Sequence, residues 1–264
     1  MTAPPAPVTR PRGPNGWLVI GGVFTALLLI AGGLSAAGWL GYRTELQEHV
    51  YEADVTSIFL EVDTGDLRLS PGEAGAVTVE RRLFWSYRKP TFEERWDGQT
   101  LRVTGDCSGW FSIGPGCGVD YTLRVPEGVS VQARTSTGDV SVTNIDGDLH
   151  LTSSTGDIRV TGGGGALQLS TSTGDIIASD VTSDTIDAST STGDVRLGFA
   201  DAPRTVSAEA STGDIRIVVP DGDSYRIDAD ASTGDVRVSV GRNDDSGRSI
   251  VARTSTGDVD VSYG

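Results

Sequence analysis

The chain has 264 residues, of which 35 are glycine, 22% are charged and 6% are aromatic, a composition typical of a turn-rich globular chain with one large domain or two small ones. Its 21 basic and 36 acidic residues give a net charge of −15, and the part that follows Arg43 holds 18 basic and 36 acidic residues. This charge argues against a nucleic-acid-binding protein, because phosphate contacts require a basic face, and two His and two Cys are too few for a zinc or iron–sulfur site.

An apolar segment near the amino terminus predicts a membrane anchor. Residues 17–40 contain no charged side chain and, at about 1.5 Å per residue, are long enough to cross a hydrocarbon layer of about 30 Å. Trp17 and Trp39 stand near its ends, as expected for rings at lipid–water interfaces. The alternative is a cleaved signal peptide. We predict a single-pass transmembrane helix over 17–40, a disordered tail over 1–16 before it, and a stalk over 41–53 that continues the helix.

Charges and cysteines predict the orientation of this anchor. Arg10 and Arg12 precede the apolar segment and Arg43 alone follows it closely, which places the tail in the cytoplasm and the remainder outside the cell membrane. Cys107 and Cys117 are spaced to close a short loop by a disulfide, which suits an oxidising exterior. The alternative for this pair is two unpaired thiols.

A repeat dominates the rest of the chain. Ser-Thr-Gly-Asp followed by Val or Ile occurs seven times between Ser136 and Val259, at intervals that grow from 18 to 23 residues, and an earlier copy occurs at Asp63–Leu67. The glycines of the seven copies are Gly138, Gly156, Gly174, Gly193, Gly213, Gly234 and Gly257. The aspartates of all eight copies are Asp66, Asp139, Asp157, Asp175, Asp194, Asp214, Asp235 and Asp258. These residues are predicted to form a structural row of turns.

Strands are predicted on both sides of each turn, since apolar residues alternate with polar ones there. The predicted inward positions of the first strand are Val131 and Ala133, Leu149 and Leu151, Leu167 and Leu169, Ile186 and Ala188, Val206 and Ala208, Ile227 and Ala229, and Ile250 and Ala252. The return loops are too short for a crossover helix, so equivalent strands must stack in parallel. The fold class is therefore all-β, a parallel, β-helix-like β-solenoid of stacked two-strand rungs over residues 54–264.

Stacked turns also place like charges close together. Neighbouring turn aspartates about 4.8 Å apart repel one another. We expect these carboxylates to bond the local amides of their turns, and arginines two residues further along to offset the repulsion. These arginines are Arg68, Arg159, Arg196, Arg216 and Arg237. The last copy carries Asp260 instead, which we interpret as a charge that protects the edge of a terminal rung.

The insertion over residues 71–128 differs in composition because it holds eight of the 17 aromatic residues. One interpretation is a β-hairpin cap over the open end of the solenoid. The other is an aromatic platform for an envelope protein or a glycan, with Trp85, Trp96 and Trp110 as partner-binding residues.

The segments Leu60–Leu67 (LEVDTGDL) and Val119–Pro126 (VDYTLRVP), together with the serial turns, resemble a known bacterial family. It is the "putative adhesin" family of unknown function with β-strand repeats, also described as toastrack-like, and the resemblance covers about residues 54–264. The resemblance implies a β-solenoid ectodomain that is often tethered to a membrane and sometimes linked to envelope-stress sensing. It implies no catalytic residues.

Three functions follow as hypotheses. The first is a noncatalytic, membrane-anchored surface module for adhesin-like binding or envelope-stress sensing, without cofactor or metal. The second is a calcium-stabilised β-roll, which the direct Gly-Asp order and the neighbouring arginines disfavour. The third is a carbohydrate-active enzyme, disfavoured because the paired aspartates all belong to repeated turns, while His49 lies in the predicted stalk and His150 at an outward, solvated position.

Overall fold

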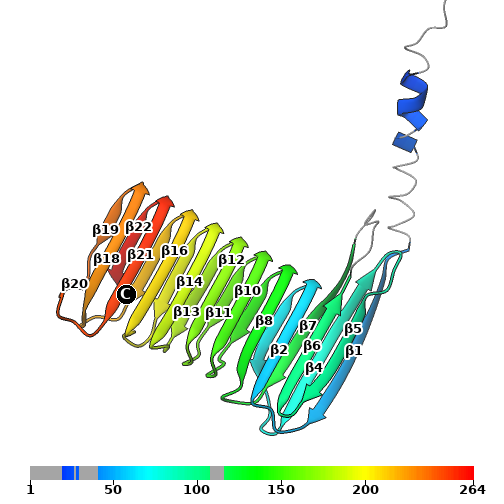
Figure 1. The fold of residues 1–264 in the computed structure, drawn as a ribbon, viewed down its shortest axis with the longest axis horizontal. Coiled ribbons are helices and arrows are strands. Elements are labelled where there is room, and N and C mark those ends of the chain that lie inside the picture. Colours follow the sequence, from blue (N-terminus) through cyan, green and yellow to red (C-terminus); the bar gives the residue numbers. More distant parts are fainter. Residues whose placement is uncertain (1–19, 27, 30–40, 108–115) are drawn as a thin grey trace, which may run out of the picture.

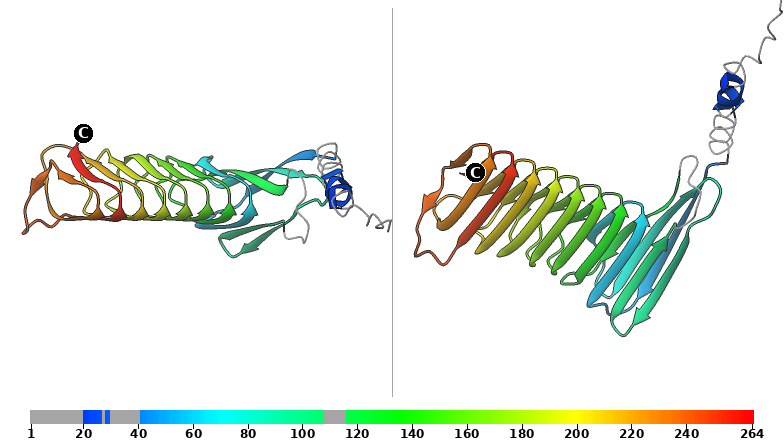
Figure 2. Two further views of the ribbon diagram at one scale, coloured as in Figure 1. Left: turned by 90° about the horizontal axis from the view of Figure 1, so that it is seen from above. Right: turned by 45° about the horizontal axis from the view of Figure 1, so that its top comes forward.

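Two long sheets lie face to face and run together as a solenoid (Figures 1 and 2). The structure is a computed structural model that describes residues 20–26, 28–29, 41–107 and 116–264. Sheet A has the strand order β1-β4-β7-β3-β9-β11-β13-β15-β17-β22-β19, and sheet B has the order β20-β18-β21-β16-β14-β12-β10-β8-β2-β6-β5. A coil consists of one sheet B strand, a turn, and the sheet A strand that follows.

The central coils confirm the predicted solenoid. Their sheet B strands are β8 (Ser130–Thr137), β10 (Leu149–Thr155), β12 (Leu167–Thr173), β14 (Thr185–Thr192) and β16 (Thr205–Thr212). Their sheet A strands are β9 (Val140–Thr143), β11 (Ile158–Thr161), β13 (Ile176–Val181), β15 (Val195–Phe199) and β17 (Ile215–Val219). Equivalent strands pair in parallel, with Leu149 beside Leu167 and Ile158 beside Ile176. The repeat therefore fixes the register of both sheets.

The interior is filled by the predicted aliphatic positions. Leu151, Leu169 and Ala188 are at most 1% exposed, and their neighbours in the same rows are equally buried. Ile227 and Ala229 are the two predicted positions that are only partly buried, because their strand lies near an edge of sheet B. Burial of these rows is the main favourable term, at about 25 cal/mol for each Å² of apolar surface.

The insertion contributes a further coil as well as a cap. The earliest turn joins β2 (Ser57–Thr64) to β3 (Leu67–Pro71), and the insertion forms β4 (Ala76–Trp85), β5 (Thr91–Asp97), β6 (Thr100–Asp106) and β7 (Cys117–Val125). Strand β6 pairs in parallel with β2, and β7 pairs in parallel with β3. The expectation that the whole insertion is a hairpin cap is therefore wrong for its second half, which is a solenoid coil.

Antiparallel strands cover the amino-terminal end of the solenoid. Strand β1 (Arg43–Glu52) pairs with β4, and β5 pairs with β6. The predicted helical stalk is therefore wrong for the residues of β1. Ten residues of this segment find a strand partner in β4, and this pairing overrides local helical preference.

The predicted transmembrane helix is described only in part. Residues 20–26 and 28–29 are helical and expose large apolar side chains such as Val23 and Phe24, while the rest of 17–40 lies outside the described residues. Within the ranges that the structure describes, no helix has both the length and the apolar character needed to cross a bilayer. The anchor stays a prediction.

The last two coils are inverted in space relative to their order in the chain. They comprise β18 (Ser224–Thr233), β19 (Val236–Val238), β20 (Gly241–Arg242), β21 (Ser249–Thr256) and β22 (Val259–Tyr263). Strand β21 lies between β16 and β18, and β22 lies between β17 and β19. The last repeat is therefore internal, and its Asp260 is in register with Arg216 on one side and Arg237 on the other. The interpretation of Asp260 as a charge on a terminal edge is wrong, because this carboxylate lies between two cations.

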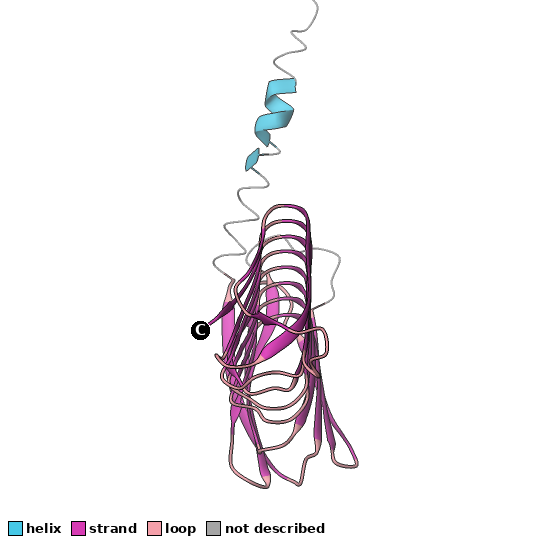
Figure 3. Ribbon diagram, turned by 90° about the vertical axis from the view of Figure 1, so that its left-hand side faces the viewer, coloured by secondary structure: helices cyan, strands magenta, loops and turns pink. Residues whose placement is uncertain are grey.

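The turn glycines stack with no space for a side chain. Viewed from the carboxy-terminal end, the turns align in a row while the loops at the opposite edge are wider (Figure 3). The glycines of the eight turns have φ between 137° and 145°, a region that L side chains rarely adopt. A Cβ built on Gly193 would lie 2.0 Å from the carbonyl oxygen of Gly174 in the neighbouring coil. Glycine is thus required both by conformation and by the distance between coils.

We expect Gly193→Ala to destabilise the protein by about 3 kcal/mol or more, since backbone strain and a clash with a neighbouring carbonyl act together. Gly198→Ala in the same coil is the control, because its Cβ would meet its nearest atom at 3.8 Å. Thermal unfolding followed by circular dichroism measures both changes. Equal melting temperatures for the two variants would contradict this account of the turn.

Candidate functional site

The turn aspartates form a continuous hydrogen-bonded ladder along one edge of the solenoid. In each coil the backbone N–H of the turn aspartate donates to Oδ1 of the aspartate in the preceding coil, at 2.8–3.1 Å. In spatial order the ladder contains Asp120, Asp66, Asp139, Asp157, Asp175, Asp194, Asp214, Asp258 and Asp235. The expectation that each carboxylate bonds amides of its own turn is wrong, because Oδ1 of each aspartate accepts the N–H of the turn aspartate in the next coil.

Asp120 is a ladder residue that the turn motif does not identify. Val119 stands where the other turns have glycine, and its carbonyl oxygen faces Gly65 of the next coil as a turn glycine carbonyl would. The signal in the sequence is the alternation of Tyr121 and Leu123 after this aspartate, which matches the strand that follows each turn.

Arginines offset the charge of the ladder at four of the five predicted positions. These are Arg68, Arg159, Arg196 and Arg237, whereas Arg216 makes no ion pair with an aspartate in the part of the chain that the structure describes. Arg159 contacts Asp157 at 2.6 Å and Asp139 at 3.5 Å. Two coils later, Arg196 makes the equivalent contacts with Asp194 and Asp175. Arg82 from the cap donates to Asp120 at 2.6 Å, which raises the pKa of the Arg82 guanidinium. Exposed ion pairs of this kind contribute about 0–1 kcal/mol each. Their role is to make the close spacing of carboxylates tolerable.

A row of buried hydroxyls runs beside the ladder. In five of the seven Ser-Thr-Gly-Asp copies, the residue before the motif is a Ser or Thr that points inward, and its hydroxyl donates to a turn glycine carbonyl of the preceding coil. Ala210 and Ala231 occupy this position in the other two copies. The donors are Thr135, Ser153, Thr171, Thr190 and Thr254, at 3.0–3.4 Å from the oxygen. The Ser and Thr within the motif itself are exposed. This row was not found from the motif, although its place in the alternation of the strand signals it.

The ladder is therefore a structural element. Oδ1 accepts an amide hydrogen bond in every coil that has a successor, and Oδ2 meets arginine in several of them. Among the residues that the structure describes, no group of three or more His, Cys, Asp or Glu side chains is placed to hold a metal ion.

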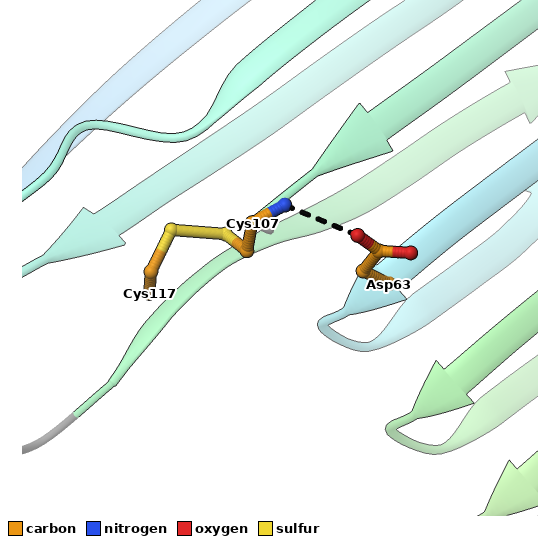
Figure 4. The surroundings of a disulfide bond; sticks show 3 residues. All are labelled: Asp63, Cys107 and Cys117. Carbon is orange, nitrogen blue, oxygen red and sulfur yellow. Dashed lines mark hydrogen bonds between the residues drawn. A yellow bond between two sulfur atoms is a disulfide. The ribbon is translucent and has the colours of Figure 1, made fainter. Parts of the chain in front are cut away.

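A disulfide closes the turn of the coil formed by β6 and β7 (Figure 4). Cys107 and Cys117 are bonded as predicted, at the edge where the other coils have Ser-Thr-Gly-Asp. The backbone N–H of Cys107 donates to Oδ2 of Asp63 in the neighbouring coil at 3.3 Å. Burial raises the pKa of Asp63, and the nearby Asp106 carboxylate raises it further. The crosslink thus lies at a turn whose sequence lacks the repeat motif.

A polar cluster fills the space between the sheets at the amino-terminal cap. Glu94 of β5 accepts hydrogen bonds from Arg81 of β4 and from the Tyr51 hydroxyl of β1, and its side chain is only 8% exposed. Burial and the hydrogen bond to Glu94 raise the pKa of Tyr51 to about 12. The Tyr51 ring packs edge-on against Trp96 at 5.4 Å between centroids. The cluster joins the two sheets where the repeat is absent.

Two of the aromatic residues proposed for partner binding, Trp85 and Trp96, lie in different sheets. Trp85 ends β4 in sheet A and Trp96 lies in β5 of sheet B, and both are half-buried against the core. Trp110 lies outside the described residues. His49 of the predicted stalk packs on Tyr51 with ring centroids 4.4 Å apart. The role of these tryptophans in binding stays a prediction.

A groove of about 630 Å³ crosses the outer face of sheet B. Small side chains such as Ser130 and Ala166 form its floor, and larger ones from the next outward row form its wall. The wall residues occupy equivalent positions of neighbouring strands and comprise Arg102, Phe59, Gln132, His150, Gln168 and Asp187.

The wall side chains are ordered by contacts with one another. The Arg102 guanidinium lies 4.4 Å from the centroid of the Phe59 ring, and Nδ1 of His150 lies 2.5 Å from Oε1 of Gln168. His150 is thus half-buried in the wall rather than fully solvated. Sequence patterns did not reveal the groove, because its equivalent wall positions are 18 or more residues apart and hold five different residue types.

The comparisons with known proteins identify the family of this fold. The family model described as Toastrack DUF4097 matches residues 124–263, just over half of the chain. The chain belongs to the toastrack family. This confirms the resemblance seen in the serial turns, while the match begins at Arg124 and so includes only the end of the VDYTLRVP segment. No curated protein matches the toastrack chain.

Solved structures similar to this toastrack chain are distant in sequence. A "putative adhesin" from Bacteroides fragilis is 13% identical, with a TM-score of 0.46 over 83% of this chain and 97% of that one. A "putative cell adhesion protein" from Clostridium sporogenes is 13% identical, with a TM-score of 0.42 over 84% of this chain and 100% of that one. A "putative lipid binding protein" from Parabacteroides distasonis is 13% identical, with a TM-score of 0.35 over 84% and 97%. Likenesses of this size carry no argument about function.

We expect Asp194→Ala to destabilise the toastrack solenoid by about 1–3 kcal/mol, because the amide of Asp214 then loses its acceptor at 2.8 Å. Asp194→Asn is the matched control, since it keeps an Oδ1 acceptor and loses only the ion pair with Arg196, for a cost of about 0–1 kcal/mol. Urea unfolding measures both. An equal loss for Asn and for Ala would show that charge pairing, rather than the amide bond, holds the ladder.

Proposed function

We propose that the protein is a noncatalytic, membrane-anchored binding module outside the cell, which holds a linear envelope glycan in the groove on the outer face of sheet B. The observation that carries this proposal is the groove itself, with its row of planar and aromatic side chains in register along the solenoid axis. Concave surfaces that combine apolar area with a few fixed polar groups are the usual place for ligands.

The chemistry of the wall suits sugars. The amides of Gln132 and Gln168 and the imidazole of His150 offer both donors and acceptors for hydroxyl groups, and the Phe59 side chain adds apolar contact area. Equivalent wall positions follow one another from strand to strand at about 4.8 Å, so an extended polymer along the axis meets a planar or polar side chain at each step.

Two features support a solenoid outside the cell that is anchored in the membrane. The Cys107–Cys117 disulfide is stable in an oxidising compartment. The helical residues near the amino terminus expose Phe24, Leu28 and Leu29, which favours burial of these side chains in lipid. An anchor before residue 41 would hold the solenoid by its amino-terminal cap, since β1 begins at Arg43.

The noncatalytic part of the proposal rests on how the acidic groups are used. The aspartates that the repeat brings close together are engaged by amides and arginines. The same engagement disfavours the calcium-roll alternative, because calcium requires several free oxygen ligands.

Binding to glycans is tested with full-length protein in detergent and insoluble peptidoglycan as the probe. We expect the wild type to sediment with the polymer, and the double variant Gln132→Ala, His150→Ala to lose at least about tenfold in affinity, which corresponds to about 1.4 kcal/mol. The control is Arg216→Ala on the outer face of sheet A. Failure of the wild type to bind this polymer and a panel of soluble polysaccharides, or capture of a protein in their place, would overturn the glycan proposal.

Calcium dependence is tested by thermal unfolding in chelator and in millimolar calcium. We expect equal melting temperatures in the two conditions, since a ligand that binds only the folded state would raise the melting temperature. A rise with calcium would favour the β-roll alternative instead.

A further inference from the structure

The wall of the groove on sheet B repeats with a period of two strands. Arg102, Gln132 and Gln168 occupy every second strand of the row, and each carries N–H donors on a planar group. The strands between them carry the rings of Phe59 and His150. Donor and ring therefore alternate along the solenoid axis, and equivalent side chains recur about 9.6 Å apart, twice the strand spacing of about 4.8 Å.

Contacts between neighbours hold this alternation in place. The Arg102 guanidinium packs on the Phe59 ring, and His150 contacts the side-chain carbonyl oxygen of Gln168. Because this oxygen is occupied by His150, the amide N–H donors of Gln168 remain for a ligand. The Gln132 side chain has no hydrogen-bond partner within the described residues. The wall thus presents open N–H donors at a fixed spacing.

The floor beside this row supplies neutral hydroxyl groups. Ser57 and Thr100 are hydrogen-bonded to each other at 2.8 Å, and Ser130 is the next floor position along the axis. Asp148 follows it, and its Oδ1 accepts the backbone N–H of Ala166. The part of the groove that lies nearest the cap therefore combines hydroxyl groups on its floor with donors and rings in its wall.

We propose that the groove binds a β-1,4-linked glycan of N-acetylated sugars, an inference that rests on the proposed glycan-binding function and names its ligand class. In such a chain each sugar is rotated by about half a turn relative to its neighbour, so the acetamido groups of every second sugar lie on the same side. An extended sugar of this kind is close in length to one strand spacing. The repeat of two sugars therefore matches the repeat of two strands in the wall.

Each part of the wall then has a partner on the sugar chain. The N–H donors of Gln132 and Gln168 bond the acetamido carbonyls of two sugars that are separated by a third, and Arg102 reaches the next such carbonyl. The rings of Phe59 and His150 pack against the sugars between them. Three sugars therefore span the two glutamines, and five extend to Arg102.

This match predicts discrimination between glycans of the same length. A β-1,4-linked glucose chain has the same repeat but hydroxyl groups in place of acetamido groups, and an α-1,4-linked glucose chain coils, so its equivalent groups do not recur along a straight line. A site built to hydrogen-bond one group of a ligand discriminates strongly against ligands that lack it.

Hexasaccharides test the ligand class by isothermal titration calorimetry with full-length protein in detergent. We expect the β-1,4-linked hexamer of N-acetylglucosamine to bind at least tenfold more tightly than cellohexaose, which has the same linkage without acetamido groups, and than α-1,4-linked maltohexaose. The trimer of N-acetylglucosamine is expected to bind at least fivefold more weakly than the hexamer, because it cannot reach all three donors.

Isosteric variants test the donors without altering the shape of the wall. Gln132→Glu and Gln168→Glu each replace amide N–H donors by a carboxylate oxygen, and we expect each to weaken binding of the N-acetylglucosamine hexamer at least tenfold. Equal melting temperatures of these variants and the wild type check that the fold is kept. Gln99→Glu is the matched control, since Gln99 is exposed in the turn between β5 and β6 and does not line the groove, and it is expected to leave the affinity unchanged.

The failure of this inference can be told apart from the failure of the proposed function. Equal affinity for the three hexamers, or folded glutamate variants that bind as tightly as the wild type, would show that the wall does not recognise the two-sugar repeat, while sedimentation with peptidoglycan would leave the proposed function in place. Absence of binding both to the hexamers and to the polysaccharides of the sedimentation test would overturn the two together.

Discussion

The close approach of successive turns is the constraint on which the rest of the structure depends. With a carbonyl oxygen 1.9–2.2 Å from the place a Cβ would occupy, each of the eight motif turns must have glycine, and the aspartate that follows is brought into reach of the next coil's amide. One glycine therefore sets the coil spacing, the register of both sheets and the hydrogen bond that links neighbouring coils. The arginines, the buried hydroxyls and the aliphatic rows all lie at fixed offsets from this turn.

Both ends of the solenoid break the simple order of the chain in the same way. At the amino-terminal end, the coil of β2 and β3 lies inside the later coil of β6 and β7. At the carboxy-terminal end, the last coil of β21 and β22 lies inside the coil of β18 and β19. The first and last coils of the chain are thus each held between two neighbours. The outermost coils are joined to the solenoid at both their beginning and their end, which limits fraying.

Much of this fold was predictable because the repeat acts locally. The alternation around residues such as Leu151 and Leu169 determines which face is buried, and the return loops leave only parallel stacking. The inversion of the last two coils was not apparent from the motif, since the strands of both coils carry it. The observed order is favoured by charge, because Asp260 lies in register between Arg216 and Arg237, and Arg253 between Glu209 and Asp230. Strand β1 was missed because its polar sequence becomes a strand only when β4 pairs with it. The groove depends on outward residues that are brought together by the coil spacing alone.

The inverted carboxy-terminal coil has a consequence for how such a protein grows during evolution. Duplication of a repeat between β8 and β17 lengthens the rod without changing either end, because the new coil meets identical surfaces above and below. A repeat appended after Gly264 would follow β22, which lies between β17 and β19 and therefore has no free edge for a further strand. Differences in length among related chains are therefore expected to arise by insertion of whole coils into the central part of the solenoid, while the structure of both ends is kept.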